Sequence, residues 1–152
     1  MTQPAKAAPW HLWVVAILSL IWDGYGGYDY LMTQMANRDY LSAVTEPYGL
    51  SVDTAIAYYD SFPLWVEFAW GLAIWASVAG ALLLALRNRF AYPAFALSLV
   101  GLVPAMVWQV VNPMDGLEGA GAAAWIMPAV VTVMLAFQTW YARAMAARGV
   151  LR

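Results

Sequence analysis

The sequence predicts an all-α membrane protein, a single domain over residues 1–152 that forms a four-helix transmembrane bundle. Hydrophobic residues make up 64% of the 152 residues, charged residues only 11%, and the mean hydropathy is +0.64. Soluble domains are about 45–50% apolar and about 25% charged. The apolar residues also gather into four runs, each close to the roughly 20 residues that an α-helix needs to cross the hydrocarbon core. These runs cover about 10–32, 64–86, 90–111 and 122–140.

The first run has one alternative interpretation, a signal peptide that is removed. Val14 to Trp22 is a short apolar stretch that follows a start containing Lys6. No Ala-x-Ala cleavage site comes after it, and the aromatic stretch from Tyr25 to Tyr30 is not typical of a processing region. We therefore expect a retained helix, whereas cleavage would leave three spans.

The charged residues between the runs predict the orientation of the bundle. Six of the seven Lys and Arg residues precede the first run, link the second and third, or follow the fourth. The acidic residues lie in the other two connections or within the runs. The positive-inside rule therefore predicts a multi-pass membrane protein with both termini in the cytoplasm.

The long first connection, which we expect outside the cytoplasm, contains two short amphipathic helices. They are predicted over about 38–44 and 51–62, with Ser51 as the N-cap and Asp53 in the first turn of the second. The turn between them runs from Glu46 to Gly49. The two interpretations of this segment are a lid over the outer mouth of the bundle and an arm that docks a partner.

Close helix packing is predicted where small residues recur at every fourth position. The second run has such a stripe, and the third has a weaker one, so these two helices are expected to cross closely. The residues are Ala69, Ala73, Ser77 and Ala81 in the second run and Leu97, Gly101 and Ala105 in the third.

Asp23 is the main candidate for a functional side chain. It lies about 15 Å from Trp13 along the helix, near the membrane midplane. No apolar run contains a Lys or Arg to pair with it. We expect this carboxyl group to be protonated, held by donors such as Tyr25, Tyr28 or Trp22, hydrated in a cleft, or paired with an incoming cation.

The other candidate ligand or proton sites lie nearer the outer surface. Asp23 shares a helical face with Gly26, Gly27 and Tyr30, which suggests a glycine-lined strip facing outward. Asp29 is about 240° around the helix from Asp23 and is expected to face another neighbour. The full set of candidates is Asp23, Tyr25, Tyr28, Asp29, Tyr30, Glu67 and Gln109.

Composition and motifs exclude several classes of function. The chain has no Cys and one His, His11, so we expect no metal site and no cofactor. A net charge of −2 without a basic stripe argues against a nucleic-acid partner. No nucleophile with an adjacent base, Walker loop or dinucleotide motif is present, so we expect no enzymatic activity.

Four sequence stretches resemble a group of small, largely uncharacterised four-helix inner-membrane proteins of proteobacteria. They are Trp10-His11-Leu12-Trp13 with the run from Trp22 to Gln34, then Phe62-Pro63-Leu64-Trp65, and finally Gly80 to Arg87. The stretch from Asp29 to Thr33 is the most specific part. The resemblance implies a multi-pass protein of the bacterial inner membrane, and some members of the group are labelled sugar transporters.

These patterns predict a protein that binds or transports a small polar or cationic solute through an outward-facing cleft around Asp23. Its expected partners are membrane lipids, the solute, and a second copy or a larger membrane complex. The first alternative is an accessory subunit whose glycine and aromatic face docks another membrane protein. A membrane enzyme is the second.

Overall fold

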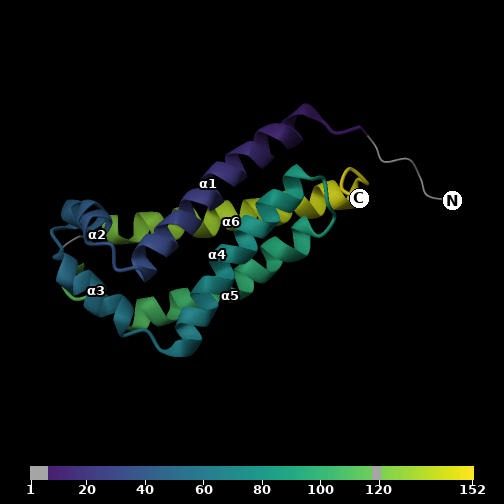
Figure 1. Cartoon of the computed structure of the whole chain (residues 1–152). Coiled ribbons are helices and arrows are strands. Elements are labelled where there is room, and N and C mark those ends of the chain that lie inside the picture. The colour runs from purple at the N-terminus through teal and green to yellow at the C-terminus, as the bar shows by residue number, and fades with distance from the viewer. Residues whose placement is uncertain (1–6, 118–120) are drawn as a thin grey trace.

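The computed structural model describes residues 7–117 and 121–152, and in these it contains six α-helices and no strand (Figure 1). The all-α prediction is confirmed for this part of the chain. Four helices are long: α1 (Trp10–Gln34), α4 (Leu64–Ala85), α5 (Ala91–Val111) and α6 (Ala123–Ala147). The short helices α2 (Arg38–Thr45) and α3 (Val52–Asp60) are joined by a 3-10 turn, Glu46–Tyr48.

Three helices of the described residues, α4, α5 and α6, are long and apolar enough to cross a membrane. The helix α1, with 25 residues, is long enough to cross a membrane. It is not among the three apolar helices, because Asp23 and Asp29 lower its hydropathy. The three apolar helices indicate a membrane protein.

The end of α6 differs from the sequence-based expectation. The apolar run suggested an end near residue 140, but the helix continues to Ala147. The added residues favour a helix and keep an inward-facing stripe, because Tyr141, Ala142 and Met145 are all buried. The other three long helices begin and end within two residues of the predicted limits.

Among the described residues, α4 and α5 form the most extensive helix contact, and small residues make this approach possible. A Cβ built on Gly101 would lie 2.5 Å from the carbonyl oxygen of Ala69 and 2.7 Å from the nitrogen of Ala73. The Ser98 hydroxyl donates a hydrogen bond of 2.5 Å to the carbonyl of Ala73 across the same contact. The helix contact expected from the small-residue stripe is therefore present, and Gly101 is the residue that permits it.

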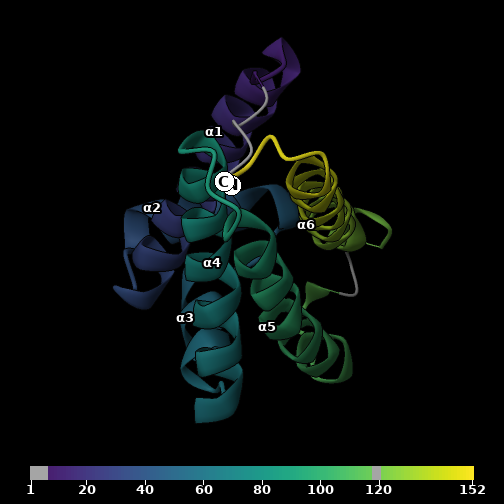
Figure 2. The same cartoon turned by 90° about the vertical axis from the view of Figure 1, so that its right-hand side faces the viewer.

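The other two long helices flank this pair. Figure 2 shows α1 beside α4 and α6 beside α5. Figure 1 places the start of α1, the α4–α5 turn and the end of α6 at one end of the bundle, with α2 and α3 at the other. At the first end, His11 and the Tyr141 hydroxyl form a hydrogen bond of 2.5 Å that joins α1 to α6.

The residues after α6 fold back onto the α4–α5 turn. The backbone N–H of Arg89 donates to the carbonyl of Arg152 at 2.9 Å, and the N–H of Arg152 donates to the carbonyl of Arg87 at 2.8 Å. Val150 and Leu151 are buried by this contact. It fixes the end of α6 against the two central helices.

At the opposite end, α3 is attached to α4 and α5 by aromatic side chains. The ring of Tyr59 stacks on Trp70 at 5.5 Å, and the ring of Phe62 meets Trp108 edge-on at 4.7 Å. The Tyr58 hydroxyl donates to the carbonyl of Asn112 at 3.0 Å. These contacts hold α3 against α4 and α5.

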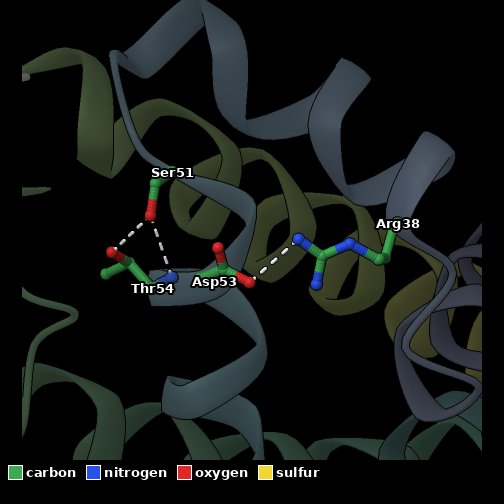
Figure 3. A network of polar contacts seen from close by, with 4 residues as sticks. All are labelled: Arg38, Ser51, Asp53 and Thr54. Atoms are coloured by element: carbon green, nitrogen blue, oxygen red, sulfur yellow. Dashed lines mark hydrogen bonds and ion pairs between the residues drawn. The ribbon is translucent and has the colours of Figure 1, made fainter.

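Local capping defines the start of α3, as the sequence predicts. The Ser51 hydroxyl accepts a hydrogen bond of 3.0 Å from the backbone N–H of Thr54 (Figure 3). Asp53, in the first turn, forms an ion pair of 2.9 Å with Arg38 at the start of α2. Both side chains are exposed, so this pair orients the two short helices more than it stabilises them. Gly49 ends the turn between them with a φ of 68°, where glycine is favoured.

Candidate functional site

Asp23 lies in the interior of the bundle, where it contacts a helix distant in sequence. Its side chain belongs to the buried stripe of α1 and is 5% exposed. The amide nitrogen Nε2 of Gln138 donates a hydrogen bond of 2.8 Å to Asp23 Oδ2. Gln138 is on α6 and is 1% exposed, so this polar bridge between α1 and α6 is shielded from solvent.

The amide of Gln138 is only half satisfied. Its oxygen Oε1 is buried and has no hydrogen-bond partner in the described part of the chain. Ser77 of α4 is buried within reach of the Asp23 carboxyl group, but its hydroxyl donates to the carbonyl of Ile74 at 2.9 Å. The Ser77 hydroxyl is therefore not a donor to Gln138 Oε1.

The glycine strip next to Asp23 is covered by side chains of α4. A Cβ on Gly27 would meet Val78 at 3.5 Å and Trp75 at 3.8 Å, and a Cβ on Gly26 would meet Ile74 at 3.9 Å. These are ordinary packing distances. An alanine would therefore also fit at Gly26 or Gly27, and the contact of α1 with α4 does not depend on the missing side chains.

Asp29 belongs to a separate contact near the C-terminal end of α1. The Tyr40 hydroxyl of α2 donates a hydrogen bond of 2.6 Å to Asp29 Oδ1. Burial and this hydrogen bond to a carboxylate raise the pKa of Tyr40 well above its ordinary value. The Tyr25 hydroxyl lies 3.4 Å from that of Tyr40, and the Tyr28 ring meets the Tyr40 ring edge-on at 5.4 Å. These residues attach α2 to α1.

Tyr25 and Tyr28 do not serve as donors to Asp23, although they were expected among its partners. Their side chains are 54% and 48% exposed. The described hydrogen bond to Asp23 comes from the amide of Gln138.

The remaining predicted residues are dispersed. The Tyr30 ring packs edge-on against Trp70 at 4.8 Å. Glu67 is half-buried in the first turn of α4. Gln109 donates to the carbonyl of Ala105 in its own helix, at 3.3 Å. Asp23 is thus the one predicted residue in the buried polar centre.

Two cavities stand apart from this centre. One, of about 590 Å³, lies between α3 and the end of α5. The other, of about 390 Å³, lies between α5 and the start of α6. Asp23 lines neither. Within residues 7–117 and 121–152, no group of three or more His, Asp or Glu side chains is placed to hold a metal ion.

Sequence reasoning missed Gln138, the partner of Asp23. The donors considered for Asp23 were close to it in sequence, whereas Gln138 is 115 positions away. A useful signal was present, since Gln138 is a strongly polar residue within an apolar helix. Pairing each such residue with a polar residue of another helix would have suggested this contact.

No family model, curated protein or solved structure matches this chain. The resemblance to the proteobacterial membrane proteins therefore stays a prediction.

Proposed function

We propose that this chain is a four-span protein of the bacterial inner membrane that binds or transports a small polar or cationic solute at a site around Asp23. The observation that carries the proposal is a carboxyl group that is 5% exposed on a helix whose neighbour α4 contains no Lys or Arg. Placing a charge at membrane depth costs about 2.5–3.5 kcal/mol on insertion scales. Ionisable residues in such places commonly mark pathways for solutes or ions.

The proposal includes α1 as the fourth span. Its 25 residues extend about 37 Å, which exceeds the hydrocarbon thickness of about 30 Å. Its two carboxyl groups are both hydrogen-bonded to side chains of other helices, which reduces the cost of burying them. The end of the bundle that carries most of the basic residues is proposed to be cytoplasmic.

In this conformation the proposed site is closed, so access requires α1 and α6 to separate. Their side chains are joined by two hydrogen bonds in the described residues, Gln138 to Asp23 and His11 to Tyr141. Each helix otherwise packs mainly on a different partner, α1 on α4 and α6 on α5. Opening between them would expose Asp23 and leave the central α4–α5 pair intact.

Ligand binding to the purified protein in nanodiscs tests the proposal. The ligand panel contains alkali cations, primary and quaternary amines, and neutral sugars, with binding followed by calorimetry and thermal shift. Asp23→Asn removes the charge and keeps the shape of the side chain. Glu67→Gln is the matched control, because it neutralises a half-buried carboxyl group outside the polar centre.

We expect at least one class of ligand to bind the wild type and Glu67→Gln, with a loss of at least tenfold in affinity for Asp23→Asn. Tenfold corresponds to about 1.4 kcal/mol. Equal affinity for Asp23→Asn and the wild type would overturn the role of this carboxyl group. Absence of binding by the wild type to every class would overturn the solute proposal itself.

The second candidate function, an accessory subunit of a larger membrane complex, is favoured by one surface of α1. A Cβ on Gly24 would have no atom within 4 Å, and the adjacent Tyr25 and Tyr28 are exposed. An open glycine next to aromatic side chains can accept a helix of another protein. This alternative predicts stoichiometric copurification of one partner, which Gly24→Leu abolishes without unfolding the protein.

A further inference from the structure

The side-chain oxygen of Gln138 has no hydrogen-bond partner among the described residues, which shows that a donor is missing beside Asp23. Buried polar groups are nearly always hydrogen-bonded, so an orphaned acceptor that is 1% exposed requires an explanation. Its amide nitrogen is already bonded to Asp23 Oδ2 at 2.8 Å. The absent component is therefore a hydrogen-bond donor for Oε1 next to the Asp23 carboxyl group.

A proton on Asp23 supplies this donor, and no further residue or ligand is needed. A carboxylic acid has one O–H donor, and a primary amide has both donors and an acceptor. The acid can donate to Gln138 Oε1 while Gln138 Nε2 donates to Asp23, which gives two antiparallel hydrogen bonds between planar groups. Because one of the two bonds is already formed, the second requires only rotation about side-chain torsions.

The packing around Asp23 favours a proton over a larger cation. Asp23 lines neither of the two cavities described above, and α4 side chains cover the neighbouring glycines. A metal cation would need several oxygen ligands and the space to hold them. A proton needs no cavity.

No ionisable group of the surrounding helices compensates a negative charge at Asp23. On α4 the hydroxyl of Ser77 faces this carboxyl group, and on α6 the amide of Gln138 does; neither is charged. The described α5 contains no charged residue. The other ionisable side chains of these four helices do not face Asp23. Two pairs are hydrogen-bonded elsewhere, Tyr141 with His11 and Asp29 with Tyr40. The rest lie at other positions: Glu67 in the first turn of α4, Tyr92 at the start of α5, Arg143 exposed on α6, and Tyr25, Tyr28 and Tyr30 toward the C-terminal end of α1.

We propose that the ligand held at Asp23 in this closed conformation is a proton, bound between α1 and α6 as a carboxylic acid–amide pair with Gln138. The inference rests on the function proposed for the Asp23 site and names the ion at that site. Loss of the proton leaves a carboxylate facing an amide oxygen, two acceptors that repel each other. Deprotonation thereby weakens the bridge between α1 and α6, which is the contact that must open to admit a solute.

The protonation state can be read directly by infrared spectroscopy. The protein is labelled with ¹³C-aspartate, reconstituted in nanodiscs and titrated with alkali, and the C=O stretch of protonated carboxylic acid is followed. We expect a labelled acid band at neutral pH that disappears as the pH rises. The band is absent in Asp23→Asn, shifted in Gln138→Leu because the amide partner is lost, and unchanged in the control Asp60→Asn, which changes an exposed aspartate of α3.

Thermal unfolding over the same pH range provides the second measurement. An asparagine at position 23 can form both hydrogen bonds with Gln138 without a proton. The melting temperature of the wild type is expected to fall as the acid band disappears, whereas that of Asp23→Asn stays at the value of the protonated wild type. If Asp23→Asn does not fold, the labelled wild type and Gln138→Leu still decide the assignment.

Failure of this inference is distinct from failure of the proposed function. A wild type without an acid band at neutral pH, or one whose melting temperature follows the sodium concentration at fixed pH, would overturn the proton and leave solute binding at Asp23 in place. A titrating band in a protein that binds none of the solutes supports the proton site and overturns solute transport.

Discussion

The close crossing of α4 and α5 can be tested by adding one methyl group at Gly101. In Gly101→Ala the new Cβ would lie 2.5 Å from a carbonyl oxygen of α4 and 2.7 Å from a backbone nitrogen. Both atoms belong to the backbone, so they cannot move aside by changing rotamer. The two helices would have to separate by about 1 Å, and a gap of 0.5–1 Å already removes a quarter to a half of the contact energy per atom pair.

Two opposing effects determine the magnitude. Replacing glycine by alanine within a helix stabilises the helix by about 0.5–1 kcal/mol. Overpacking of a well-packed contact costs about 1–3 kcal/mol. Separation of the helices also lengthens the hydrogen bond from Ser98 to the carbonyl of Ala73, which is 2.5 Å long. The overpacking term is therefore expected to dominate at Gly101.

Gly24→Ala is the matched control. It makes the same substitution in a long helix, but the new Cβ would have no atom within 4 Å, so only the gain in helix stability applies. We expect the free energies of unfolding of Gly101→Ala and Gly24→Ala to differ by about 1–3 kcal/mol, with Gly24→Ala the more stable. Unfolding in mixed micelles of increasing SDS content, followed by circular dichroism, measures this difference. Equal free energies for the two variants would refute the close crossing at Gly101.

Three further predictions concern the helices α2 and α3 and the topology. Tyr40→Phe removes the donor to Asp29 and should lower stability by about 1 kcal/mol and speed hydrogen exchange in α2; unchanged exchange would show that this contact does not hold the helix. Burial raises the pKa of Tyr59 to about 12 from 10.0, so the stability provided by its neutral phenol is present below pH 10 and lost as the pH rises toward 12. Melting curves should show this alkaline loss, and Tyr59→Phe should reduce it. The chain has no native cysteine, so Asp60→Cys should react with a membrane-impermeant maleimide in spheroplasts and Arg148→Cys should not, and the reverse pattern would overturn the proposed orientation.

The sequence predicted the helices well because local composition determines them. The apolar runs, the Ser51 cap and the turn ending at Gly49 all depend on residues close to one another in the chain. The end of α6 was missed because apolar content was used as the criterion, while Arg143 and its neighbours remain good helix formers beyond the apolar run.

The polar centre was predicted only in part. An acid without a basic partner in the first apolar run identified Asp23 as unusual, and it is buried. Its partner depends on how α6 is rotated and displaced relative to α1, which the hydrophobic pattern of either helix does not determine. The hydrophobic pattern of α6 is weak, because apolar residues surround nearly the whole helix in a membrane protein.

The uneven packing of α6 has a consequence for the bilayer around the protein. The buried residues of this helix all lie in its second half, from Leu135 onward, whereas Trp125, Ile126 and Val133 in the first half are exposed. If α6 spans a membrane, acyl chains must supply the neighbours that this half lacks. The stability of the protein should then vary with the hydrophobic thickness of its host, being greatest where the lipid matches the apolar length of α6 and lower in short-chain detergents.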